Sequence, residues 1–203
     1  MKYFVAILCF ILLESESDAQ TRLTITYEHT TNSKRFVKKL LLVVNDSVSY
    51  SYPLRKEERY LPAIPLGSRY QEYSHYVDHS KRIHFFQLQP HSSPKYLIED
   101  TLKTIQWELG DIEKIILGYT CKKAITTIGK KEITVFYCPE LASPAGPFTF
   151  GGLPGTILQC LYKGSPEVTT AIEILKTAEE IVEPTDGKKI TRKEFDKIVK
   201  QSM

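Results

Sequence analysis

The sequence lacks a long apolar run, is poor in cysteine, and contains none of the short motifs that identify common enzyme classes. Its one unbroken apolar run, Tyr3–Leu13, has about 11 residues, whereas a membrane-spanning helix needs about 20. P-loop, G-x-S-x-G and HExxH motifs and a glycosidase-like pair of carboxylates are missing. We therefore expect no stable membrane span in the mature chain, no cofactor, no metal and no assignable catalytic residue.

The N-terminus has the organisation of a secretory signal peptide, residues 1–19. Lys2 precedes the apolar run, and a polar stretch follows it and ends with Ser17 and Ala19. Small residues three and one positions before a cut match the preference of signal peptidase. We expect cleavage before Gln20 and a protein that is exported: periplasmic, secreted or associated with the outer membrane. The alternative, a retained membrane anchor, needs a longer apolar run.

Most of residues 20–203 has the pattern of short antiparallel strands in a single domain. Apolar and polar residues alternate with period two, and Asn, Asp, Gly or Pro separate the alternating segments. Asn45-Asp46 tolerates the positive φ of a tight hairpin turn, and prolines predict a loop over Pro53–Gly67. The predicted strands include Arg22–Thr30, Lys39–Val44, Ser47–Tyr52, Tyr70–Val77, Arg82–Leu88, Thr104–Leu109 and Ile157–Tyr162.

The C-terminus is the one segment with a clear helical pattern. Thr191 and Glu194 have the spacing of a capping box, and Phe195, Ile198 and Val199 form an apolar stripe after it. We expect this helix to dock on the sheet. The predicted fold class is mainly β: a single domain with a curved antiparallel sheet and a C-terminal helix, for which the half-barrel of periplasmic lipoprotein carriers is an analogy.

Five residues in a row, Gly151, Gly152, Leu153, Pro154 and Gly155, predict a tight turn. Pro154 presets φ near −65° and Gly155 accepts positive φ, which fits a type II turn. The two preceding glycines indicate a bend or a close backbone approach. A phosphate-binding loop needs a helix N-terminus after its glycines. Because a strand pattern follows here, we favour a packed turn at a sheet corner over a ligand cradle.

Three segments around this turn share a pattern with a known family. They are residues 118–124 (GYTCKKA), 135–141 (VFYCPEL) and 146–158 (GPFTFGGLPGTIL). In this order they resemble the GLPGLI family of exported Gram-negative bacterial proteins, with departures at Cys138 and Thr156 and also at Phe148. The resemblance implies export and a shared fold. Since the function of that family is uncharacterised, it implies no catalytic residue.

Cys121 and Cys138 are predicted to form a disulfide. Residues 128–131 (IGKK) are typical of a two-residue hairpin turn. This turn places the two cysteines directly opposite each other at a non-hydrogen-bonded position, where side chains lie closest, and an exported protein meets an oxidising compartment. Two reduced thiols are the alternative, because a shift of one residue would put the cysteines on opposite faces. Cys160 is expected to be buried and unpaired.

No sequence feature identifies a ligand or an activity. His75 and His79 are four residues apart, but they fall in a predicted strand and turn, and no third metal ligand has a recognisable spacing. The basic residues are interleaved with acidic ones, which argues against a nucleic-acid partner. We expect a non-enzymatic binding, carrier or assembly module for an apolar ligand, a peptide or another envelope protein, with its site on the concave face of the sheet.

Two alternatives remain open at the level of the sequence. A secreted hydrolase with an unrecognised site would show a carboxylate and a histidine converging in a polar pocket. A structural surface protein would show an exposed apolar patch and no cavity.

Overall fold

A computed structural model describes residues 22–30, 38–45, 47–53, 70–90, 94–177 and 180–201. The predicted signal peptide and nearly all of the predicted proline-rich loop lie outside these ranges. No helix in the described ranges is long and apolar enough to cross a membrane. The elements are β1 (Arg22–Thr30), β2 (Lys38–Val44), β3 (Val48–Pro53), β4 (Tyr70–Asp78), β5 (Ile83–Pro90), β6 (Tyr96–Thr101), β7 (Glu108–Ile116), β8 (Tyr119–Ile128), β9 (Lys131–Cys138), β10 (Thr156–Tyr162), β11 (Val168–Thr177), β12 (Lys188–Thr191) and α1 (Arg192–Gln201).

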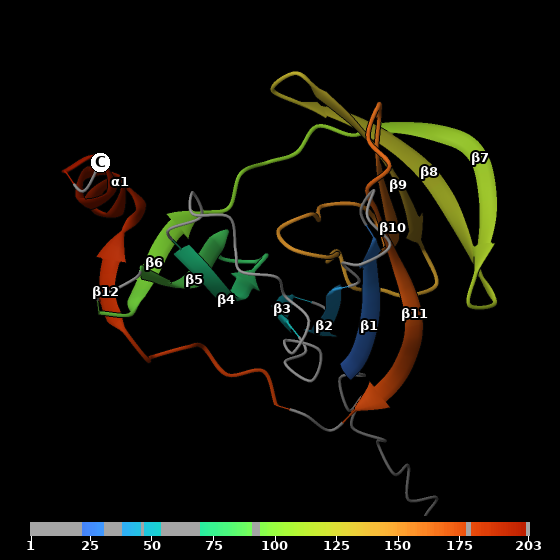
Figure 1. Cartoon of the computed structure of the whole chain (residues 1–203). Coiled ribbons are helices and arrows are strands. Elements are labelled where there is room, and N and C mark those ends of the chain that lie inside the picture. The colour runs from blue at the N-terminus through green and yellow to red at the C-terminus, as the bar shows by residue number, and fades with distance from the viewer. Residues whose placement is uncertain are drawn as a thin grey trace, which may run out of the picture.

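The strands form one open 12-stranded sheet in the order β12-β6-β5-β4-β3-β2-β1-β11-β10-β9-β8-β7. From β6 to β1 and from β11 to β7, neighbours in the sheet are also neighbours in the chain. The sheet therefore consists of two meanders that join where β1 pairs with β11 (Figure 1). Among the described strands only β12 runs parallel to its neighbour, β6. The predicted fold class, a mainly β domain with a C-terminal helix, is confirmed.

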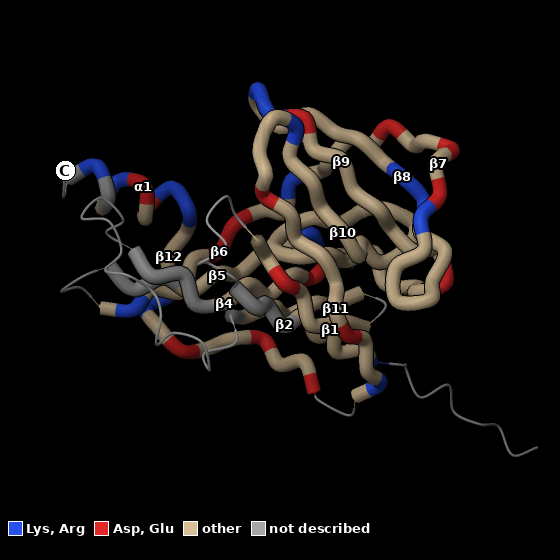
Figure 2. The backbone as a smooth tube through the Cα atoms, turned by 45° about the vertical axis from the view of Figure 1, so that its right-hand side comes forward, with Lys and Arg blue, Asp and Glu red and all other residues tan. Residues whose placement is uncertain are grey.

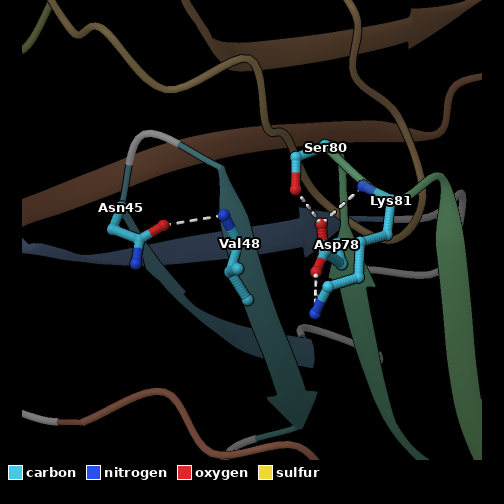
Figure 3. Close-up of polar contacts among 5 residues, drawn as sticks. All are labelled: Asn45, Val48, Asp78, Ser80 and Lys81. Atoms are coloured by element: carbon cyan, nitrogen blue, oxygen red, sulfur yellow. Dashed lines mark hydrogen bonds and ion pairs between the residues drawn. The ribbon is translucent and has the colours of Figure 1, made fainter.

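Side chains of the turns hold the first hairpins in place, as Figure 3 shows. The Asn45 side-chain oxygen accepts the backbone N–H of Val48 at 2.7 Å at the turn from β2 to β3. In the turn from β4 to β5, Asp78 accepts a hydrogen bond from the Ser80 hydroxyl at 2.6 Å and one from the Lys81 N–H at 2.8 Å. Burial alone would raise the pKa of Asp78, but these hydrogen bonds and the Lys81 ammonium, 3.1 Å from the carboxylate, together outweigh it and lower the pKa.

The segment between β9 and β10, residues 139–155, packs inside the curve of the sheet, in the middle of the molecule (Figure 1). Leu141 belongs to the same buried cluster as Ile25 and Tyr27 of β1. Leu153 belongs to a second cluster with residues of β8, β9 and β10. The chain's own side chains thus occupy the inner face of this part of the sheet, which is where the carrier interpretation places an apolar ligand.

The segment between the two meanders differs from the prediction. Residues 104–107 are not a strand, and β7 begins only at Glu108. The Thr126 hydroxyl donates to the Gln106 carbonyl at 2.7 Å, and the Trp107 indole donates to the Gly151 carbonyl at 3.0 Å. Bonds to side chains and to a loop replace the strand pairing that the alternating pattern predicted over Thr104–Leu109.

Helix α1 begins with the predicted capping box. The Thr191 N–H donates to the Glu194 carboxylate at 2.7 Å, and the Glu194 N–H donates to the Thr191 hydroxyl at 3.3 Å. The first of these bonds is the main reason that the pKa of Glu194 is lowered. Phe195 is buried in a cluster with Tyr96 and Ile98 of β6. The predicted docking of the helix on the sheet is confirmed.

Candidate functional site

The predicted turn at Leu153, Pro154 and Gly155 leads directly into β10. Gly155 has a φ of 147°, and its N–H donates to the Leu153 carbonyl at 2.8 Å. The Thr156 N–H donates to the Leu141 carbonyl, whereas in a type II turn it would bond to Leu153. The structure therefore has a tighter turn around Pro154 than the one predicted, because Thr156 already pairs with the segment after β9.

The two glycines before this turn are engaged with the protein itself. A β-carbon on Gly151 would lie 2.6 Å from the Pro144 carbonyl oxygen and 2.9 Å from the imidazole of His79. The Gly152 N–H donates to the same Pro144 carbonyl at 2.8 Å. Gly151 is thus a point of close backbone approach, and its carbonyl and the neighbouring N–H bond to other parts of the chain. This arrangement agrees with a packed corner and not with a ligand cradle.

The cysteines lie in the predicted register but are free thiols in the structure. Ile128 pairs with Lys131, and the same register places Cys121 opposite Cys138. Both are buried, as is Cys160. Burial is the main reason that the pKa of Cys121 is raised to about 12 and that those of Cys138 and Cys160 are raised. The structure thus has protonated thiols where we predicted a disulfide, and the bond itself stays a prediction.

Two histidines that the sequence did not connect form a stacked pair on β4 and β5. Nδ1 of His75 and Nε2 of His84 are 2.9 Å apart, and the ring planes differ by 17°. Phe86 lies directly opposite His75 and extends the stack, with its centroid 5.1 Å from that of His84. At this distance one imidazole donates a hydrogen bond and the other accepts it. We call His75, His84 and Phe86 the histidine stack.

Polar residues of the two adjacent strands flank the histidine stack. Ser51 of β3 is directly opposite His75, and Asp100 of β6 is directly opposite His84. Directly opposed residues project to the same face of a sheet. The Ser51 hydroxyl is buried and has no hydrogen-bond partner within the described part of the chain. A serine, two histidines and a carboxylate thus follow one another across four strands.

Helix α1 adds a cation to the same face. The guanidinium carbon of Arg192 lies 5.4 Å from the centroid of the Phe86 ring, and Arg192 also pairs with Asp196 at 3.0 Å. The position of Arg192 is fixed on one side by the capping box at Thr191 and on the other by Phe195, whose ring contacts Tyr96 edge to face at 5.9 Å. The site combines three flat rings, a guanidinium and a carboxylate.

The residue types are those of a hydrolytic triad, but the geometry favours binding. A nucleophilic serine must be hydrogen-bonded to its base and reach the substrate. Ser51 is only 1% exposed and is not bonded to His75. His75 and His84 are half-buried and Arg192 is exposed, so these groups can meet a ligand at the surface. Among the described residues, no group of three or more histidine, cysteine or acidic side chains is placed to hold a metal.

The partner of His75 is His84 across the hairpin and not His79, the histidine nearer to it in the chain. His79 lies four residues further on, in the turn, where its Nε2 is 3.3 Å from the Ser49 hydroxyl. The signal for the true partner is the register of the hairpin. Because Asp78 pairs with Ile83, position 77 pairs with position 84, and His75 and His84 become diagonal neighbours on one face.

The comparison with known families identifies the relatives of this chain. The family described as "N-glycanase peptide, N-terminal domain" matches residues 69–201, about two thirds of the chain. The chain belongs to this family of N-glycanase N-terminal domains. The matched range includes His75, His84, Phe86 and Arg192. No curated protein matches the chain.

The N-glycanase N-terminal-domain fold also appears among solved structures. "Structure of PNGF-II in C2 space group" matches with a TM-score of 0.69 and 16% identity, covering 90% of this chain and 33% of that chain. "Structure of PNGF-II in P21 space group" matches with a TM-score of 0.68 and 17% identity, covering 91% and 34%. The chain thus spans about a third of the length of these structures, and at this identity the likeness shows the fold alone.

The resemblance to the GLPGLI family is therefore wrong, because the chain belongs to the N-glycanase N-terminal-domain family. Residues 152–157 (GLPGTI) include the turn around Pro154. In this turn Gly155 packs against the backbone of Cys138. Proline followed by glycine is the usual chemistry of such a turn, so this motif reports local geometry and not ancestry. Both structures named above are of PNGF-II and not of a lipoprotein carrier.

Proposed function

We propose that this domain is a non-hydrolysing binding module that recognises N-glycosylated polypeptides through the histidine stack and Arg192. The family name refers to an N-glycanase, an enzyme that acts where a glycan is joined to a polypeptide. This chain spans only about a third of the matching PNGF-II structures, so we propose recognition of that substrate class and not its cleavage.

The observation that carries the proposal is the histidine stack with its two flanking charges. The C–H faces of a sugar ring pack on flat apolar or aromatic surfaces, and the half-buried rings of His75 and His84, whose planes differ by 17°, lie beside the buried ring of Phe86. Sugar hydroxyls need both donors and acceptors. Arg192 supplies donors, Asp100 supplies acceptors, and imidazole can supply either.

A titration followed by NMR tests this proposal. The protein is titrated with an N-glycosylated peptide, with the same peptide without its glycan, and with the free glycan. We expect the glycosylated peptide to shift the imidazole signals of His75 and His84 and the unglycosylated peptide to leave them unchanged. Equal binding of both peptides, or no binding of any of the three, would contradict glycan recognition at this site.

Variants locate the binding site. Arg192→Gln removes the cation beside Phe86, and loss of charged hydrogen bonds should weaken glycopeptide binding about tenfold. His29→Gln is the control, because His29 is not part of the histidine stack. It lies on β1, where its Nδ1 is 2.8 Å from the Thr169 hydroxyl. We expect this control to bind as the wild type does. If both variants bind equally well, the histidine stack is not the glycan site.

Hydrolysis is a second candidate function, which the order Ser51, His75, His84, Asp100 across the sheet favours. Mass spectrometry of an N-glycoprotein incubated with the domain tests it directly. Because Ser51 is buried, we expect no loss of glycan mass. Release of glycan by the wild type but not by Ser51→Ala would replace the binding proposal with a catalytic one.

We also propose that the protein is exported, because residues 1–19 have the pattern of a signal peptide and N-glycoproteins occur outside the cytoplasm. N-terminal sequencing of the protein from the cell envelope and the medium should give Gln20 as the first residue. A mature form that still begins with Met1 would contradict export by cleavage.

A further inference from the structure

Helix α1 carries a cluster of cations on a side that does not pack on the sheet. A surface hollow of about 460 Å³ borders the helix and is lined by Arg192, Lys193, Asp196, Lys197 and Lys200. Neighbours on a helix surface are three or four residues apart, and this spacing joins the five residues into one face. Figure 2 shows the basic residues along α1. Four cations against one carboxylate leave a net charge of +3 on this face, which we call the basic face of α1.

The three lysines of the basic face are open to a ligand, because the acids of α1 are engaged with other residues. Asp196 pairs with Arg192 at 3.0 Å, and Glu194 completes the capping box. The lysines are exposed, and within the described part of the chain no hydrogen bond or ion pair joins them to another residue. Like charges one helical turn apart repel each other. A bound anion would relieve this repulsion.

The basic face adjoins the histidine stack through Arg192, which belongs to both. Its guanidinium carbon lies 5.4 Å from the centroid of the Phe86 ring. From Arg192 the basic face continues to Lys200, about 12 Å further along the helix at 1.5 Å per residue. A glycan that packs on the histidine stack can therefore extend directly over the lysines.

The acid of the candidate site lies away from this basic face. Asp100 is opposite His84, near the last residue of β6. Helix α1 instead contacts the first residue of that strand, because the Phe195 ring packs edge to face on Tyr96. The site is thus acidic toward one end of β6 and basic toward the other, and an anionic sugar is favoured at the end where α1 lies.

We propose that the basic face of α1 selects acidic N-glycans, whose sugars carry carboxylate or phosphate groups. This inference rests on the proposed glycan recognition by the histidine stack and names the class of glycan that the same site prefers. Lysine ammonium groups donate charge-assisted hydrogen bonds to such anions, whereas a neutral glycan gains nothing from their charge. Phe195 and Ile198 pack on the sheet, so insertion of an apolar helix face into lipid would require α1 to leave it.

Calorimetry on the whole chain with two pairs of N-glycopeptides tests the preference. One pair is a sialylated glycopeptide before and after sialidase treatment, and the other carries phosphorylated mannose before and after phosphatase treatment. At low salt we expect the acidic member to bind about tenfold more tightly than the neutral one, an advantage that high salt reduces. A preference within one pair only would support the inference and identify the anion. Equal affinities within both pairs would overturn it and leave the proposed function standing, whereas no binding of any glycopeptide would overturn both.

A pair of double variants separates the basic face from the overall charge of the protein. Lys197→Gln with Lys200→Gln should bring the affinity for the acidic glycopeptide down to that for the neutral one. Lys130→Gln with Lys131→Gln removes the same charge at exposed positions of the turn between β8 and β9, and it should keep the wild-type preference. Glutamine is a good helix former, and circular dichroism checks that both variants fold. Equal loss of the preference in both variants would overturn the assignment to α1. So would an acidic peptide without a glycan that binds as tightly as the acidic glycopeptide.

Discussion

A β-carbon on Gly155 would lie 2.6 Å from the carbonyl carbon of Cys138. Gly152 also has positive φ, 84°, but has open space where its β-carbon would be. Gly152→Ala should therefore cost about 1 kcal/mol of stability through backbone strain alone. Gly155→Ala adds steric overlap with the backbone, for a total cost of about 3 kcal/mol. Urea unfolding compares the two variants, and equal midpoints would contradict the close approach at Gly155.

The stability of the domain should depend on the protonation of His79. Burial lowers the pKa of His79 and outweighs the opposing effect of the charge on Asp78. The unfolded chain, with its ordinary histidine pKa of about 6.5, then binds more protons than the folded domain. We expect the free energy of unfolding to fall as the pH drops below about 6.5.

The variant His79→Gln tests this origin of the pH dependence. Urea unfolding at pH 8 and pH 5 should give a smaller difference for His79→Gln than for the wild type. The control His29→Gln should keep the wild-type difference. If His79→Gln retains the full pH dependence, another group is responsible.

In the reduced protein, the three thiols should react slowly as long as the domain is folded. Burial raises the pKa of Cys121 to about 12, and only the thiolate is nucleophilic. Iodoacetamide at pH 8 should therefore label the folded protein much more slowly than the urea-unfolded one. Rapid labelling of Cys121 in the folded protein would contradict its burial.

Oxidation tests the disulfide that the sequence predicts. Non-reducing peptide mapping of the exported protein should show the fragments with Cys121 and Cys138 linked, and Cys160 unlinked. By the chain-closure entropy, a disulfide over so short a loop adds about 3 kcal/mol to the free energy of unfolding. Reduction of the bond should therefore lower the melting temperature without unfolding the domain. If all three cysteines react with a thiol label in the denatured, unreduced protein, the bond does not form.

Removal of the helix cap should loosen α1. Thr191→Ala deletes the hydroxyl that accepts the Glu194 N–H, at a cost of about 1 kcal/mol. Amide hydrogen exchange in residues 192–195 should accelerate in this variant. Thr191→Ser keeps the hydroxyl and is the control. Exchange as slow in Thr191→Ala as in Thr191→Ser would mean that the docking of Phe195, and not the cap, holds the first turn.

Local turn chemistry is the part of this fold that the sequence predicts well. The turns at Asn45, Asp78 and Gly129 involve residues close in the chain, and each sets the register of its own hairpin. The capping box at Thr191 and Glu194 was predictable for the same reason. No local signal indicates that β12 joins β6 in parallel, because the two strands are far apart in the chain and share no turn.

The candidate site was harder to predict than the fold because residues of several elements form it. The register of one hairpin brings His75 and His84 together, but Ser51 and Asp100 come from neighbouring strands, and Arg192 arrives with the helix. The family resemblance failed for a related reason. The motif at Leu153 to Gly155 is a local turn, whereas the match to the N-glycanase N-terminal-domain family covers residues 69–201.

The pairing of β1 with β11 has a consequence for the order of folding. Thr26 and Glu173, which contact each other across this pair, are 147 residues apart in the chain. Each meander can form from neighbouring hairpins, but their junction requires closure of a very long loop, and such non-local pairing slows folding. As the chain emerges N-terminus first, one edge of β1 stays without its partner until β11 has been made. A chaperone that shields β1 during this interval would raise the yield of folded protein more than one that acts on the later hairpins.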